Sequence, residues 1–339
     1  MKKLFVAIGL LIGYITGQAQ IMPDSTVQIC AYWTPGDKYA YQAVEEKLKI
    51  DEKGDTTLVN RESEVRTFEV LSQTKDKYLI RFTYSDYESM DEEDQLINDV
   101  TVKASGPCVV EFETTGMGEF VGVTNLDVLV KQGKKAVKPV MEALWERMGE
   151  EERELFSKKA LQKQLSSAME NPSLLTAYVY KDLDRMLFFH GARLDTTQVY
   201  EVEEQFMLSW GDGKPIAGTT SLWIDSKQTD EYSAVCLTST EIEAGDAIAS
   251  AISSVSQFFD LKKDQKEALG DSIQAGLKDL KARMEQFTGE EVHLETGVPL
   301  NVFMERTVSV SAGNRKSSVI VRNTVNLITE DDKKHGSFI

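Results

Sequence analysis

Two segments of this chain, far apart in sequence, share one arrangement of strand, glycine-containing turn and strand. The first is Cys108–Thr124 and the second is Val292–Val308. In each segment an apolar run ends in Glu-Thr, a turn with glycine follows, and a second apolar run begins. This order predicts a β-hairpin, because glycine adopts the backbone angles that tight turns need. Helical sequence lies beside each copy, so we interpret the pair as a sign of internal duplication.

Strand patterns and helix patterns alternate in long runs along the rest of the chain. In the first half we expect strands at Val27–Thr34, Lys38–Ile50, Thr57–Gln73 and Tyr78–Ser85, and a solvated loop or short helix at Asp86–Asp99. From Leu126 the apolar spacing changes to three and four residues. This spacing predicts helices at Leu126–Met148, Glu150–Met169 and Leu174–Phe189, with a kink or break at Pro139.

The second half begins another run of strands near Thr196. We expect strands up to Trp210, at Ile216–Ser226 and at Glu231–Thr240, with a hairpin turn at Gly211–Lys214. Two helices are predicted next, at Ile242–Asp260 and Lys263–Phe287, the second from apolar residues three and four positions apart. The last predicted strand is Lys316–Ile328.

Alternating strands grouped in runs predict an α+β fold with curved, open antiparallel β-sheets packed on amphipathic helices. We expect a β-rich half with its helices at residues 20–190 and a second β/helix/β half at 191–328, continuous with the first. Residues 329–339 are expected to form a flexible tail.

The N-terminal residues 1–19 have the pattern of a secretory signal. Lys2 and Lys3 precede an apolar run, Leu4–Ile15, and Gly17 and Ala19 form a small-residue cleavage pattern. The sequence therefore predicts an exported protein, periplasmic or secreted, without a membrane span after cleavage. Loss of Lys2 and Lys3 would take the formal charge from −17 to −19, and so acidic an exported chain is a poor partner for nucleic acid.

Three short motifs resemble those of a family of exported proteins of Gram-negative bacteria. They are Thr34–Tyr41, Thr115–Asn125 and Thr296–Leu300, read as an opening G-x-x-Y-x-Y followed by T-G hairpins. The resemblance follows the order of elements along most of the mature chain and implies no activity. It implies a shape similar to periplasmic lipoprotein carriers, whose open curved sheets hold helices on the concave side.

Motifs for catalysis are weak, so we assign no catalytic residue, metal or cofactor. Gly270-Asp271-Ser272 with His335 looks like the blocks of a GDSL-type esterase, but Ser272 lies in a predicted helix and His335 in the tail. The other histidines lack metal-ligand spacing. We interpret His293 as a surface residue on a strand and His190 as a cationic or capping residue at a helix end.

The three cysteines, Cys30, Cys108 and Cys236, all lie in strand-like apolar contexts. An oxidising compartment would permit one disulfide and one free thiol, and three buried thiols fit the pattern equally well.

Aromatic strand faces are the best candidates for a binding site. The candidate pocket residues are Tyr78, Phe82, Tyr84, Tyr200, Glu204, Phe206 and Trp210. Glu204 is unusual because alternation places it on an apolar face, unless a bulge re-aims it or that face is open to water. Aromatic strand faces of this kind either belong to the hydrophobic core or line an apolar pocket.

The favoured hypothesis is a non-enzymatic protein that binds an apolar or lipid-like molecule or an envelope partner protein. The alternatives are a hydrolase whose site has no recognisable motif and a structural envelope protein.

Overall fold

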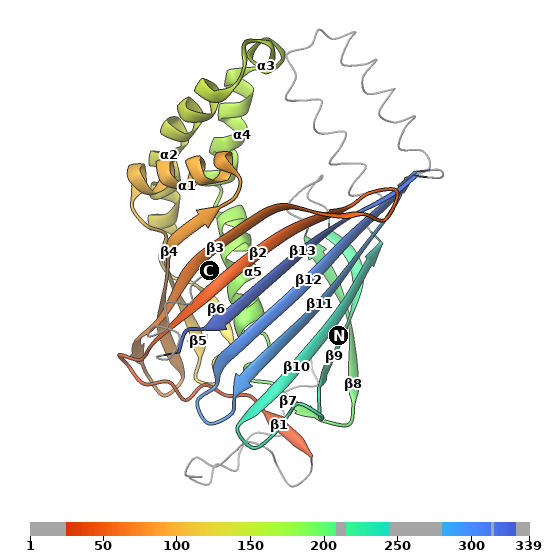
Figure 1. Cartoon of the computed structure of the whole chain (residues 1–339). Coiled ribbons are helices and arrows are strands. Elements are labelled where there is room, and N and C mark those ends of the chain that lie inside the picture. Colours follow the sequence, from red (N-terminus) through yellow and green to blue (C-terminus); the bar gives the residue numbers. More distant parts are fainter. Residues whose placement is uncertain (1–24, 208–214, 244–279, 313–314, 330–339) are drawn as a thin grey trace.

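A single large antiparallel sheet dominates the protein, and the sheet is open rather than closed on itself (Figure 1). The computed structural model describes residues 25–207, 215–243, 280–312 and 315–329. Strands make up 52% of the structure. The sheet has 11 strands in the order β6-β5-β4-β3-β2-β13-β12-β11-β10-β9-β8. The pairing of β2 with β13 joins strands from the two halves of the chain.

Most strands follow the predicted runs, but the strand predicted at Val27–Thr34 is wrong after Gln28, where the first strand ends. Their bounds are β1 Thr26–Gln28, β2 Lys38–Ile50, β3 Thr56–Gln73, β4 Lys77–Ser89, β5 Val109–Thr115, β6 Phe120–Val123, β7 Arg193–Asp195, β8 Val199–Met207, β9 Pro215–Ile224, β10 Ser233–Glu243, β11 Leu280–His293, β12 Val298–Ala312 and β13 Arg315–Leu327. β1 and β7 form a separate two-stranded sheet. The predicted antiparallel pairing is therefore confirmed, in one main sheet.

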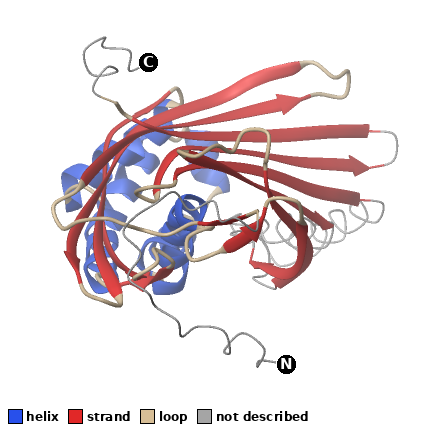
Figure 2. Ribbon diagram, turned by 90° about the horizontal axis from the view of Figure 1, so that it is seen from below, coloured by secondary structure: helices blue, strands red, loops and turns tan. Residues whose placement is uncertain are grey.

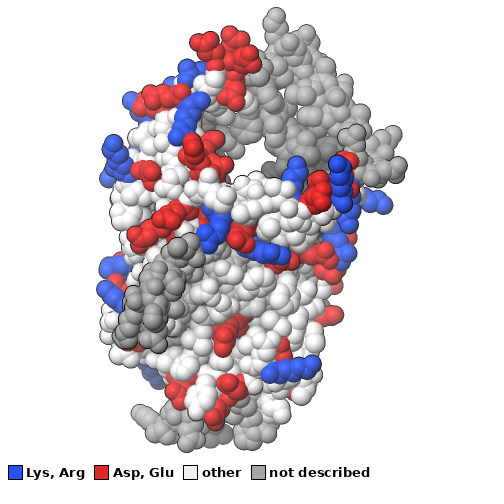
Figure 3. Space-filling view, in the orientation of Figure 1, with Lys and Arg blue, Asp and Glu red and all other residues white. Residues whose placement is uncertain are grey.

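Five helices lie on the concave side of the sheet among the described residues, as Figure 2 shows. Their bounds are α1 Glu92–Ser105, α2 Leu126–Arg147, α3 Glu150–Leu155, α4 Lys158–Glu170 and α5 Pro172–Leu187. Figure 3 shows acidic side chains gathered over α3, whose first turn holds three glutamates, Glu150–Glu152. Negative charge at this end stabilises a helix through the helix dipole.

Four helix predictions need correction. The break expected at Pro139 is wrong, since α2 continues through this residue, and Val137, Val140 and Met141 around it are buried and hold the helix in place. The alternative, a kink at Pro139, stays a prediction. The predicted helix Glu150–Met169 is two helices, with a break between α3 and α4 where the Ser157 hydroxyl accepts a hydrogen bond from the Ala160 N–H.

The predicted helix Lys263–Phe287 is wrong from Leu280 onward, where the chain forms β11 and pairs with β10 and β12. Glu241–Glu243 likewise belong to β10 rather than to the linker and start of the helix predicted at Ile242–Asp260. The rest of both helix predictions lies outside the described residues, as do the signal peptide, the turn Gly211–Lys214, Ser272 and His335.

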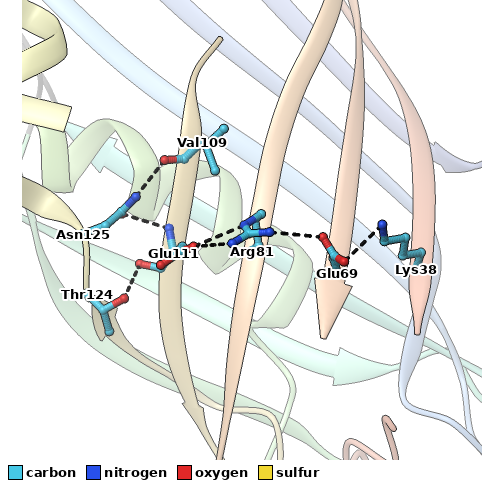
Figure 4. Close-up of polar contacts among 7 residues, drawn as sticks. All are labelled: Lys38, Glu69, Arg81, Val109, Glu111, Thr124 and Asn125. Carbon is cyan, nitrogen blue, oxygen red and sulfur yellow. Dashed lines mark hydrogen bonds and ion pairs between the residues drawn. The ribbon is translucent and has the colours of Figure 1, made fainter. Parts of the chain in front are cut away.

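The two faces of the sheet differ as the alternation predicts. On β4 and β5, Ile80, Phe82, Val110 and Phe112 are fully buried. The other face carries a row of charges across four strands, from Lys38 through Glu69 and Arg81 to Glu111, with separations of 3.1, 3.6 and 2.9 Å (Figure 4). Asn125 extends this row by accepting from the Glu111 N–H and donating to the Val109 carbonyl, both at 2.9 Å.

Both predicted hairpins are confirmed, and their turns meet at one place. The Ala31 N–H donates to the Met117 carbonyl in the β5–β6 turn, and the Tyr32 N–H donates to the Thr296 carbonyl in the β11–β12 turn. Gly118 and Gly297 have φ of +95° and +67°, and a Cβ on Gly118 would lie 2.6 Å from His190 Cδ2. The duplication itself stays a prediction.

The environment of His190 differs from the cationic role expected for it. The side chain is buried, Nε2 lies 2.7 Å from the Gly297 carbonyl oxygen, and burial lowers the pKa to about 4. His190 is therefore neutral near pH 7, and a cationic role at the helix end is wrong. His293 is half-buried at the end of β11, with Nδ1 2.9 Å from the Thr296 hydroxyl.

The three cysteines are free, so the alternative with one disulfide is wrong. Cys236 is buried, Cys30 is half-buried and Cys108 is exposed as a residue, although its thiol is partly desolvated at the wall of a cavity. The alternative of three buried thiols is therefore correct only for Cys236.

Candidate ligand-binding cavity

A cavity of about 600 Å³ lies between the helices and one flank of the sheet. The helices α1, α2, α4 and α5 and the strands β3 and β4 all contribute to its wall. Its apolar lining includes Val102, Leu129, Met169, Leu175 and Val179. This volume falls in the range of pockets that hold small molecules, and a predominantly apolar wall is typical of such pockets.

Local sequence holds α1 in place as the outer wall. The Asp91 carboxylate accepts hydrogen bonds from the Glu93 and Asp94 N–H groups at 2.8 and 3.2 Å, which caps the helix N-terminus. At the other end, Gly106 ends the helix with a φ of +83°. Gln132 Nε2 on α2 then donates to the carbonyls of Ser105 and Pro107, both at 3.2 Å, so α1 is fastened to α2.

A close helix crossing closes the next side of the cavity. Gly133 on α2 faces α4 so tightly that a Cβ at this position would lie 1.9 Å from the Met169 carbonyl oxygen. Both residues line the cavity. Only glycine permits this approach, so Gly133 sets the distance between α2 and α4.

Polar groups from β3, β4 and α5 form the inner end of the cavity. Arg66 Nε donates to Glu64 Oε1 at 2.8 Å, and Arg66 Nη2 lies 3.4 Å from Asp182 Oδ2. The Tyr84 hydroxyl donates to the same Asp182 oxygen at 3.4 Å, and the Arg66 guanidinium carbon lies 5.7 Å from the Tyr84 ring centroid. Glu64 and Tyr84 line the cavity, whereas Arg66 and Asp182 are buried behind them.

The proton affinities of these groups reflect their burial. Burial raises the pKa of the Glu64 carboxyl, and Arg66 opposes this rise. Asp182 and Glu64 raise the pKa of the Arg66 guanidinium against the effect of burial, so Arg66 stays charged. Cys108 lines the same cavity; desolvation of its thiol, then the charges of Glu64 and Asp182, raise the pKa of that thiol to about 11.

The structure distributes the predicted pocket residues over several places. Tyr84 lines the cavity. Tyr78 and Phe82 are buried in the main apolar core, where Tyr78 lies against Trp33 with ring centroids 5.2 Å apart. Tyr200 packs on a second core cluster near β1 and β7, and its hydroxyl accepts from the Asp195 N–H at 3.0 Å.

The remaining predicted residues lie at the other edge of the sheet. Glu204 and Phe206 belong to β8, whose pairing with β9 runs from Val199 to Met207 without a register shift. The backbone has no bulge at Glu204; the side chains of Glu204 and Phe206, and Trp210 as a whole, lie outside the described residues.

Sequence reasoning missed the polar end of the cavity. Glu64 and Arg66 alternate on β3 with the buried Phe68 and Val70, so the period of two places them on the inner face. The same alternation that drew notice to Glu204 would have found them. Asp182 on α5 and Cys108 before β5 carried no comparable signal.

A second depression, of about 700 Å³, lies over β8, β9 and β10 and is lined by Glu201, Glu203, Glu241 and Glu243 with threonine and serine. Within the described ranges, no group of three His, Cys, Asp or Glu residues is arranged to hold a metal ion. Among the helices that the structure describes, none combines the length and apolar character that a membrane crossing needs.

Comparisons with known proteins assign no family. No family model matches the sequence, and no curated protein matches it. A structure titled for lipid–protein interactions in lipovitellin is similar to 87% of this chain at 9% identity, with a TM-score of 0.36, and the matched part is 25% of that protein. The OmpF porin of Salmonella typhi and an outer membrane channel of Pseudomonas putida F1 both have TM-scores of 0.20, at 6% and 8% identity. The match covers 86% and 88% of this chain and 98% and 97% of theirs, respectively. Likeness at this level assigns neither a family nor an activity to the chain.

Proposed function

We propose that this protein is an exported, non-enzymatic binding protein that holds an apolar, lipid-like molecule in the cavity between α1, α2, α5 and β4. The observation that carries the proposal is the cavity itself. Its volume of about 600 Å³ suits a small molecule or a single acyl chain, and its wall is mainly apolar. The signal sequence at residues 1–19 supports export.

The wall is built to stay open rather than to collapse. The Asp91 cap and the bonds of Gln132 hold α1 against α2, and the Gly133 crossing fixes α4. A preformed apolar pocket binds without a large ordering cost, because the protein does not rearrange around the ligand. Glu64 and Tyr84 at the inner end provide the small number of polar groups that orient a ligand in such a pocket.

Titration with N-phenyl-1-naphthylamine, a neutral dye that fluoresces in apolar surroundings, tests the proposal. We expect saturable binding with a dissociation constant of roughly micromolar size, from the ligand efficiency of molecules of this size. Val102→Trp, which adds an indole to the cavity wall, is expected to weaken binding at least about tenfold, a loss of about 1.4 kcal/mol.

Val128→Trp is the matched control. Val102 and Val128 are helical valines, 43% and 45% exposed, and only Val102 lines the cavity. The dye should bind the Val128→Trp variant as it binds the unmodified protein. Absence of saturable binding, or equal affinity in the two variants, would overturn the proposal.

A further inference from the structure

The inner end of the cavity presents a hydrogen-bond acceptor to any ligand. Arg66 Nε binds one oxygen of the Glu64 carboxylate, Oε1, at 2.8 Å. The other oxygen, Oε2, receives no hydrogen bond from the described residues, and Glu64 lines the cavity with its side chain 20% exposed. A carboxylate oxygen only accepts, so a ligand group that reaches Glu64 must donate.

The charges around this end favour a cation. Arg66 is shared between Glu64 and Asp182, at 2.8 and 3.4 Å, so one guanidinium faces two carboxylates. Arg185 lies one turn further along α5, and its two terminal nitrogens have no hydrogen-bond partner among the described residues. The other charged residues of the cavity wall are Asp86, Asp99 and Lys103, two acids and one base.

The Cys108 thiol lies on the same cavity wall as Glu64. Its pKa is raised first by burial and then by the charges of Glu64 and Asp182. Both carboxylates thus act on a group at the cavity wall. Carboxylates in a cavity partly shielded from water repel anions and attract cations more strongly than the same carboxylates would in bulk water.

We infer that the cavity selects amphiphiles whose head group donates hydrogen bonds, a protonated long-chain amine first and a long-chain alcohol second, and that it excludes long-chain carboxylates. The inference rests on the proposed function, since it names the head group of the ligand proposed there. The ammonium group binds Glu64 Oε2, the carboxylate oxygen that Arg66 leaves free. The alkyl chain lies along the apolar wall formed by Leu175 and Val179.

Displacement of the bound dye by three amphiphiles of equal chain length tests the inference. Dodecylamine, dodecanol and dodecanoate are titrated at pH 7.5, below the concentrations at which they form micelles. A charge-assisted hydrogen bond predicts that the amine binds about tenfold to a hundredfold more tightly than the alcohol. Dodecanoate, which cannot donate and carries the wrong charge, is expected to bind more weakly than the alcohol.

Two variants test whether Glu64 is the source of the head-group preference. Glu64→Gln is expected to reduce the preference for amine over alcohol to within about threefold, from loss of the charge-assisted bond. Glu111→Gln is the matched control, because Glu111 is also partly exposed and paired with an arginine, Arg81, but on the outer face of the sheet (Figure 4). The control should keep the full preference.

The outcomes distinguish the inference from the proposed function. Tightest binding of dodecanoate by the unmodified protein, or an unchanged amine preference in a folded Glu64→Gln variant, overturns the inference and leaves dye binding in place. Failure of the dye to bind overturns the proposed function as well. The order in which the unmodified protein binds the three amphiphiles tests the inference even if Glu64→Gln does not fold.

Discussion

His190 Nε2 lies 2.7 Å from the carbonyl oxygen of Gly297 and joins the end of α5 to the turn of the β11–β12 hairpin. The imidazole is fully enclosed, with the Trp33 ring centroid 5.5 Å away. The two hairpin turns, far apart in sequence, thus meet through the segment Cys30–Tyr32 and one neutral histidine.

Acid should weaken the fold through His190. In the unfolded chain the imidazole takes a proton below about pH 6.5, whereas burial lowers the pKa in the fold to about 4. Between these values the unfolded state binds more protons, so stability falls as the pH falls. At about 1.4 kcal/mol per pKa unit the loss approaches 3 kcal/mol near pH 4.

Urea unfolding between pH 7 and pH 4 measures this loss. His190→Gln keeps a donor for the Gly297 carbonyl and removes the titration, so this variant should lose about 3 kcal/mol less than the unmodified protein over the same range. His293→Gln is the control and should follow the unmodified protein. Parallel loss in the unmodified protein and in His190→Gln would contradict the account.

Gly297 is expected to tolerate no side chain. Its φ is +67°, and a Cβ would lie 2.1 Å from the Cys30 carbonyl oxygen. Gly297→Ala should cost about 1–2 kcal/mol for the left-handed backbone and more for displacement of Cys30. Gly54 has a φ of +88° with nothing within 4 Å, so Gly54→Ala should cost the backbone part alone. Thermal or urea unfolding compares the two, and equal losses would contradict the close approach.

Substitution of Arg185 and of Arg66 by methionine should change the free energy of unfolding in opposite directions. Both are buried, but the terminal nitrogens of Arg185 have no partner among the described residues, whereas Arg66 binds Glu64 and Asp182. Burial lowers the pKa of Arg185 to about 10, a sign that its charge is poorly compensated. Arg185→Met should therefore raise the free energy of unfolding by about 1–3 kcal/mol.

Arg66→Met should lower the free energy of unfolding by about 3–5 kcal/mol, because it leaves two carboxylates without their partner. Denaturant unfolding of the two variants at pH 7 measures both changes. A loss of stability in Arg185→Met equal to that in Arg66→Met would show that Arg185 is paired in solution.

The Cys108 thiol is expected to react slowly near neutral pH. Burial and the charges of Glu64 and Asp182 raise its pKa to about 11, and only the thiolate reacts with maleimides. The reaction rate with N-ethylmaleimide should rise about tenfold per pH unit from pH 7 to pH 10, by the pKa relation. In Glu64→Gln the rate at pH 8 should rise, because one negative charge is gone, and an unchanged rate would contradict the field proposed for the cavity.

Local sequence predicted the strands well because each strand has one buried and one wet face. Phe82 and Ile80 are buried, and Arg81 between them joins the outer row of charges, as the period of two requires. The hairpins were predictable for the same reason, since their glycine turns are local. The error at β11 arose because Leu280 and Met284, four residues apart, fit both a helix and a strand. Pairing with β10 and β12 decided the outcome.

The cavity was beyond local patterns. Alternation places Glu64 on the inner face of β3, but the wall facing it is built by α1, α2 and α5, whose positions depend on contacts distant in sequence. The bond from Gln132 to Ser105 spans 27 residues, and the pair Arg66–Asp182 joins β3 to α5. Periodicity predicts which face of a helix is apolar but not which part of a sheet it covers.

Protection of Cys108 by a bound ligand tests the central claim most directly. Cys108 lines the cavity and Cys30 does not, so Cys30 serves as the internal control. Mass spectrometry follows the alkylation of each cysteine by N-ethylmaleimide, with and without saturating N-phenyl-1-naphthylamine. We predict that the dye slows alkylation of Cys108 at least about tenfold, the limit set by about 90% occupancy, and leaves the rate at Cys30 unchanged. Equal rates at Cys108 with and without saturating dye would contradict a ligand in this cavity.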